Sequence, residues 1–173
     1  MDPEALNTYN ALISANTRFF KILSSKIKVE FVDYDPYATR DEMTKDIKEN
    51  KSFKVMTLFS DHPIMNGRKN WEFRACHDWF THHISGQPFT QQGEFHAYNT
   101  HLKMYPLSAW PALFTEIIGQ TSCVVANGNF PEQKACILKG FDYKNLGKLS
   151  ADSEQLHKVL SEMIELEIQN FFK

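Results

Sequence analysis

The chain has 173 residues, of which 42% are hydrophobic and 13% aromatic, and its formal net charge is −2. This length favours a single domain over residues 1–173, and the composition supplies a core and excludes a disordered chain. Lys and Arg are scattered without forming a basic stripe, so the charge gives no indication of nucleic-acid binding.

The first third of the chain predicts a helix, a strand, a second helix and a second strand. Asp2 and Pro3 are a typical helix start, and apolar residues then recur at helical spacing over residues 4–23. Residues 26–33 alternate apolar and charged side chains, which indicates a half-buried strand. Thr39 can cap a polar helix that runs to about residue 49, and residues 53–60 form the second predicted strand.

The rest of the chain predicts helices only. Helical patterns cover residues 69–83, 91–104 and 107–125, where Pro111 is tolerated near the first turn of its helix. Residues 152–172 show a wide apolar face and predict a final helix. We therefore expect a mainly α protein with a small sheet of two or three strands, an α+β fold.

The cysteines and the N-terminal residues bear on the cellular location. Cys76, Cys123 and Cys136 are an odd number without a CxxC pair, which is typical of reduced thiols and not of a disulfide framework. The first residues are acidic and lack the regions of a secretory signal, and no apolar run reaches membrane-spanning length. These features predict a cytoplasmic protein without a membrane segment.

The segment from Cys76 to His83 is the most informative feature of the sequence. It holds His77 and His82, and Glu116 follows some thirty residues later. Two imidazoles and one carboxylate that leave coordination positions open suit a non-haem Fe(II) site that also binds O2. We expect His77, His82 and Glu116 to hold one metal ion within a metal-binding core at residues 69–140.

Ideal helix geometry leaves an alternative open. His77 and His82 lie roughly 140° apart around an ideal helix, so both reach one ion only if the helix ends or distorts near His82. Asp78 and His82, at positions i and i+4, do share a face and form the alternative ligand pair. Asp78 and Glu94 are also the carboxylates that we expect to take a catalytic role.

Further polar residues fall on the faces of the two later helices. Glu94 and His101 are separated by about 10.5 Å along a helix axis, so we expect at most one of them to contact the ion directly. The other should hydrogen-bond a ligand or a neighbouring helix, as partners of metal-bound histidines do. Gln120, one turn after Glu116, is expected to hold that carboxylate. Aromatic residues interleaved with these positions are candidates for lining a substrate pocket: Trp79, Phe80, Phe89 and Phe114.

The residues from Cys76 to His82, then Phe89 and Glu94, and then Phe114 to Gly119 resemble the iron-site region of the aromatic amino acid hydroxylases. In that family a His-(Asp/Glu)-x-x-Gly-His segment and a later Thr-Val-Glu-Phe-Gly segment carry a ferrous ion. The resemblance implies a helical metal-site domain, with His77 and His82 as imidazole ligands and Glu116 as the carboxylate ligand. It also implies that Asp78 lies near a tetrahydropterin that acts as reductant. A second likeness, from Gly93 to Ala135, is to uncharacterised small proteins of phage and bacterial genomes and implies no activity.

The sequence therefore leaves three classes of function. The first is a hydroxylase-like Fe(II)-dependent monooxygenase acting on a small or aromatic substrate. The second is a hydrolase in which Zn2+ on the same ligands activates water and Glu94 or Asp78 acts as the base. The third is a non-catalytic interaction protein whose polar centre only holds its helices together.

Overall fold

The computed structural model describes residues 2–130 and 132–143, and the final helix predicted at residues 152–172 lies outside them. The chain begins with α1 (Pro3–Ser24), β1 (Lys28–Val32), α2 (Arg40–Asn50) and β2 (Ser52–Met56). The helix α3 (Gly67–His77) continues directly into a π-helix, η1 (Asp78–Ile84), and α4 (Gln91–Met104) follows. The last described helices are the 3-10 turn η2 (Leu107–Ala109), α5 (Trp110–Leu113), the π-helix η3 (Phe114–Gly119) and α6 (Gln120–Asn127).

The predicted class, mainly α with a small sheet, is confirmed for the described residues. β1 and β2 form a two-stranded parallel sheet in which Lys28 pairs with Ser52, and α2 is the crossover between the strands. Thr39 caps α2 as expected, because its side chain accepts a hydrogen bond from the backbone N–H of Glu42. No helix in this part of the chain is long and apolar enough to cross a membrane.

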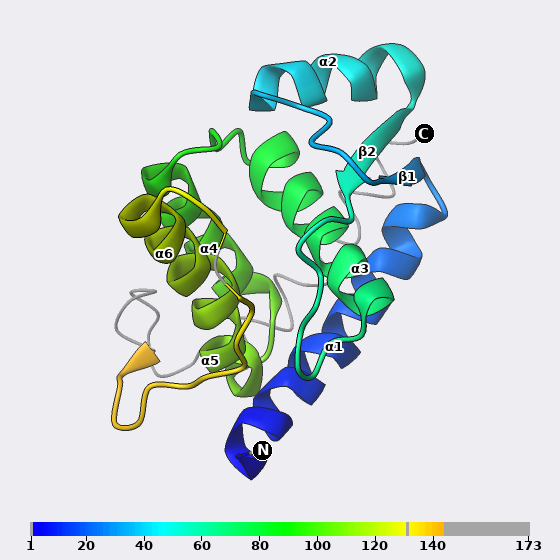
Figure 1. Cartoon of the computed structure of the whole chain (residues 1–173). Helices are drawn as coiled ribbons and strands as arrows, with labels where there is room; N and C mark the ends of the chain where they lie inside the picture. The colour runs from blue at the N-terminus through cyan, green and yellow to red at the C-terminus, as the bar shows by residue number, and fades with distance from the viewer. Residues whose placement is uncertain (1, 131, 144–173) are drawn as a thin grey trace.

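The long helix α1 packs against α3 and α5, and these contacts build the centre of the core. Figure 1 shows α3 in the middle of the molecule, with α1 and the strand pair on one side and α4, α5 and α6 on the other. The buried hydroxyl of Tyr105 donates to Asn16 of α1 at 2.7 Å, which satisfies both polar groups inside the core. The helix α4 contacts both π-helices, so the two segments that carry the predicted ligands are held by one neighbour.

Three predicted elements differ from the structure. The helix expected over residues 69–83 changes to π-geometry after His77, and the helix expected over residues 107–125 is divided into four segments. The strand expected over residues 53–60 ends at Met56. Phe59 lies in the left-handed region with φ 55°, a conformation that an extended strand excludes. The guanidinium of Arg74 donates to the carbonyls of Met56, Leu58 and Phe59 and so holds this turn.

Candidate metal centre

A π-helix brings the two predicted imidazole ligands together. His77 is the last residue of α3 and His82 lies in η1, where the N–H of Ser85 donates to the carbonyl of Phe80, five residues earlier, at 3.2 Å. Hydrogen bonding from i to i+5 places residues five positions apart on one face. The Nε2 atoms of His77 and His82 are consequently 2.9 Å apart. This is the helix distortion that ideal geometry required.

Glu94, near the start of α4, faces both imidazoles. One carboxylate oxygen lies 3.2 Å from Nε2 of His77, and the other lies 3.2 Å from Nε2 of His82. The preceding residue is a buried glycine on which a Cβ atom would lie 2.0 Å from the carbonyl oxygen of Pro88. Only a residue without a side chain lets the loop close over the first turn of α4, so Gly93 helps to fix the position of Glu94.

The spacing of these three groups fits a single metal ion. Ligand atoms at right angles around an ion, each at about 2.1 Å, lie about 3.0 Å from one another. The two Nε2 atoms, 2.9 Å apart, are close to this value, and the two 3.2 Å contacts of Glu94 are made by its two different oxygens. Two imidazoles and one carboxylate therefore face one another as candidate ligands of a single ion.

Hydrogen bonds on the far side of each ring orient the imidazoles. Nδ1 of His82 donates to the carbonyl of Gln87 at 2.8 Å, and because a carbonyl only accepts, Nε2 of the neutral ring keeps a free lone pair. Nδ1 of His77 lies 3.1 Å from Nε2 of His101, and the two rings are stacked with centroids 5.3 Å apart. His101 thus hydrogen-bonds His77, a candidate ligand. Metal-bound histidines usually have such a partner.

The shifted pKa values of these groups show that the imidazoles and the carboxylate interact strongly without an ion. Burial acts to lower the pKa of His77, but the nearby Glu94 carboxylate reverses this and the pKa is raised. Burial acts to raise the pKa of Glu94, but His77 and His82 hold it well below its usual range. Burial, followed by the charge of His77, keeps the pKa of His101 far below its ordinary value, so His101 is neutral. A divalent cation between the imidazoles and the carboxylate would replace the proton of His77.

Asp78 belongs to the same cluster. The ligand atoms of His77, Asp78 and His82 all lie within 4.8 Å of one another, so the alternative pair of Asp78 and His82 is also present in the structure. The Asp78 carboxylate makes no hydrogen bond within residues 2–130 and 132–143, and burial raises its pKa. It is therefore available as a further ligand or as a group that exchanges protons.

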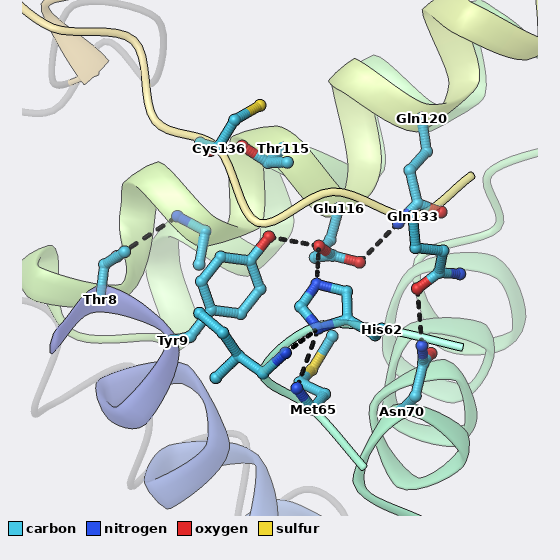
Figure 2. A network of polar contacts seen from close by, with 12 residues as sticks. Thr8, Tyr9, His62, Met65, Asn70, Thr115, Glu116, Gln120, Gln133 and Cys136 are labelled. Carbon is cyan, nitrogen blue, oxygen red and sulfur yellow. Dashed lines mark hydrogen bonds and ion pairs between the residues drawn. The ribbon is translucent and has the colours of Figure 1, made fainter. Parts of the chain in front are cut away.

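Glu116, the carboxylate ligand predicted from sequence, contacts a different set of residues (Figure 2). It accepts hydrogen bonds from the hydroxyl of Tyr9, from Nε2 of His62 at 3.2 Å and from the amide of Gln120 at 2.5 Å. Gln120 holds Glu116 as its spacing predicted. The hydrogen bonds and ion pairs of Glu116 in the described part of the chain include neither His77 nor His82, and the carboxylate that faces these two imidazoles is Glu94.

A cavity of about 480 Å3 joins the two carboxylates, since its walls include His77, Asp78, His82 and Glu94 as well as Glu116 and Gln120. Among the four aromatic residues predicted to line a pocket, Phe89 lies on this wall. Trp79 and Phe80 are instead in the core, where they are 0% and 3% exposed. Phe114 packs against Tyr98, Phe141 and Tyr143.

Sequence reasoning missed Tyr9 and His62. Tyr9 is one apolar position among many on an amphipathic helix, and His62 is a lone histidine in a loop. Neither has a neighbour in sequence that signals contact with Glu116, which is 107 residues from Tyr9 and 54 from His62. Only the packing of α1 against α5 and the adjoining η3 brings these groups together.

Comparisons with protein-family models, with curated proteins and with solved structures returned no match. The likeness to the aromatic amino acid hydroxylases therefore remains a prediction from the motif residues, and the function has to be argued from the geometry of this centre.

Proposed function

We propose that this chain is an O2-dependent, non-haem Fe(II) enzyme that oxidises a small or aromatic substrate, with the metal held by His77, His82 and Glu94. The observation that supports this most directly is the convergence of these three side chains at 2.9 Å to 3.2 Å on one wall of a cavity. Bound by three protein ligands on one face, Fe(II) keeps positions open for O2 and a co-substrate. Placing Glu94 in the site departs from the hydroxylase pattern, in which Glu116 would be the carboxylate ligand.

Residues around this centre have three different roles in the proposed enzyme: they orient the ligands, exchange protons and line the substrate site. His101 and the Gln87 carbonyl hold the two imidazoles in the orientation that binds metal. Asp78, whose pKa is raised by burial, lies beside them and can accept or release a proton at its carboxylate. Phe89 packs against the ring of His82, with centroids 4.6 Å apart, and offers an apolar wall to a substrate.

Anaerobic titration of the metal-free protein with Fe(II), followed by admission of O2, tests this proposal. We expect one Fe(II) to bind per chain, and O2 uptake to require both the metal and a reductant such as a tetrahydropterin. His83→Phe is the matched control, because His83 adjoins His82 in sequence but its ring packs against Trp79 and lies within 3.3 Å of Thr44. A wild-type protein that binds no Fe(II), or a loaded protein that consumes no O2 with any reductant, would contradict the proposal.

A hydrolase is the second candidate function, and the buried carboxyl group of Asp78 is the feature that favours it. A buried carboxyl of raised pKa without a hydrogen-bond donor suits a general base, and Zn2+ on three ligands with an open position activates water. The same preparation loaded with Zn2+ and offered ester and amide substrates distinguishes the two. Hydrolysis that is lost in Asp78→Asn, without O2 uptake in the Fe(II) form, would favour the hydrolase.

A further inference from the structure

We propose that Glu116 is a receptor for a primary ammonium group, so that the ligand of the cavity is a cationic amine. This inference rests on the proposed function only in treating that ligand as the substrate, because the binding site itself is formed by residues outside the metal centre. The proposal follows from how neutral donors hold the carboxylate, from the lack of a charged hydrogen-bond donor to it among the described residues, and from its position on the cavity wall.

Three neutral donors orient the Glu116 carboxylate (Figure 2). The N–H groups of Ile64 and Met65 donate to Nδ1 of His62 at 3.0 Å and 2.9 Å, so this ring carries its proton on Nε2 and donates to Glu116. The Tyr9 hydroxyl donates to the same oxygen as His62, and the Gln120 amide donates to the other. A carboxylate offers about four lone-pair sites. Three donors therefore leave about one site for a further donor.

Among the described residues, the basic side chain in direct contact with Glu116 is His62 at 3.2 Å, and its ring is neutral because Nδ1 accepts two N–H groups; the Glu116 side chain is only 2% exposed. Arg74 and Lys54 also line the cavity, but Arg74 acts on Glu116 through its charge and hydrogen-bonds other groups. The guanidinium of Arg74 donates to the carbonyls of Met56, Leu58 and Phe59. The ammonium of Lys54 pairs with Asp46 at 2.9 Å.

A metal ion at the proposed centre is balanced by other groups on the same wall. A divalent ion held by His77 and His82 is matched by the two carboxylates beside it, Glu94 and Asp78, so the direct contacts of Glu116 stay those with its three neutral donors. Buried charges in proteins are normally paired, because leaving water costs far more for a charged group than for a neutral one. A cation that enters the cavity can be that partner.

The chemistry of the remaining site favours an ammonium group over a second metal ion. Nε2 of His62 carries a proton and has no lone pair to offer a metal, and the Tyr9 hydroxyl is a donor whose pKa is raised, chiefly by burial. An ammonium group brings three N–H donors and can use the free lone pair of Glu116. The apolar parts of the cavity wall, among them Phe89 and Ile117, suit the hydrocarbon part of such a ligand.

Isothermal titration with benzylamine, and with the neutral benzyl alcohol for comparison, tests the inference. We expect wild-type protein to bind benzylamine at least about tenfold more tightly, since one hydrogen bond to a charged group supplies that difference. Glu116→Gln should abolish this preference and keep the metal content of the wild type. Asp35→Asn is the matched control, because Asp35 lines the same cavity but is exposed, and it should keep the preference.

Several outcomes would overturn the inference. One is equal binding of benzylamine and benzyl alcohol by the wild type. Another is a preference for benzylamine that survives in Glu116→Gln. A third is loss of the metal from Glu116→Gln, which would make Glu116 a metal ligand. If Glu116→Gln does not fold, NMR of the wild-type protein replaces this test. The signal to follow is the side-chain amide of Gln120, which is assigned by its absence in Gln120→Leu. Benzylamine should shift this signal and benzyl alcohol should not. Amine binding by a protein that takes up no metal would retain this inference and reject the proposed function.

Discussion

Replacing His101 with phenylalanine tests the metal centre without touching a ligand. The ring of His101 is fully buried and stacks on Phe73 and His77, with centroids 5.9 Å and 5.3 Å away, and a phenyl ring keeps this packing. What disappears is the hydrogen bond between Nε2 of His101 and Nδ1 of His77. The imidazole of His77 is then free to turn, and its basicity falls.

The expected size of the effect follows from the role of such partners. Loss of a hydrogen bond to a metal-bound histidine typically lowers metal affinity 10- to 100-fold, which is about 1.4 to 2.7 kcal/mol. At a free metal concentration of about 100 times Kd, the ion stabilises the wild type by about 2.7 kcal/mol, and this falls to between about 1.4 and 0.4 kcal/mol in the variant. For a chain of this size the metal-induced rise in Tm should fall from roughly 5–11 °C to roughly 1–6 °C.

The metal-free protein should respond differently to the same substitution. Leaving Nδ1 of His77 unpaired costs about 1–3 kcal/mol, but the substitution also removes Nδ1 of His101, which is buried without a hydrogen-bond partner in the structure. These contributions are of similar size and opposite sign, so the Tm of the metal-free protein should change little.

Co(II) absorption with a competing chelator gives the affinity, and differential scanning fluorimetry gives both Tm values. Unchanged affinity in His101→Phe would refute the role of His101 in orienting His77 for the metal. His83→Phe serves again as the control and should leave the affinity unaltered.

Three further predictions concern the same centre. His82→Ala should abolish tight metal binding, measured as metal content after dialysis, while its circular dichroism spectrum stays helical. Gly93→Ala should lower the free energy of unfolding by about 1–3 kcal/mol and lower metal affinity, because the new Cβ meets the Pro88 carbonyl at 2.0 Å. Gly119→Ala is the control, because its new Cβ has its nearest atom at 3.7 Å, and urea unfolding should show no loss of stability. In the metal-free protein, stability from the raised pKa of His77 is full below its ordinary pKa of 6.5 and is lost as the pH rises through the raised value. The stability that comes from the lowered pKa of Glu94 is full above its ordinary pKa of 4.5 and is lost as the pH falls through the lowered value. The free energy of unfolding in urea should therefore differ most between wild type and Glu94→Gln from pH 4.5 to 6.5.

Local signals in the sequence were sufficient for most of the fold. Asp2 and Thr39 act as the predicted helix caps, and the helix expected over residues 91–104 has those bounds in the structure. These features depend on side chains that interact with their own backbone or on a regular apolar period. The π-geometry of η1 and η3 has no such local signal, because it depends on how the helices pack.

The site was predictable in its residue types but not in its pairing. The cluster of His77, Asp78 and His82 is dense enough in sequence to be recognised, and the structure brings its ligand atoms together. The choice between Glu94 and Glu116 is not local. Two of the three donors to Glu116 come from α1 and from the loop before α3, so tertiary contacts help to decide which carboxylate faces the imidazoles.

Two of the contacts between histidine and glutamate in the described residues, His62 with Glu116 and His82 with Glu94, differ in the chemistry that the backbone gives to the ring. In the pair of His62 and Glu116, two backbone N–H groups donate to Nδ1 of the ring, so Nε2 is a hydrogen-bond donor. In the pair of His82 and Glu94, a backbone carbonyl accepts from Nδ1, so the neutral ring offers Nε2 as an electron-pair donor. In our proposals, the first arrangement fixes a carboxylate for recognition of a cation, and the second prepares an imidazole for a metal. Because a single cavity wall carries both, the same ligand can be held by its charge at Glu116 while its other end lies toward the metal centre.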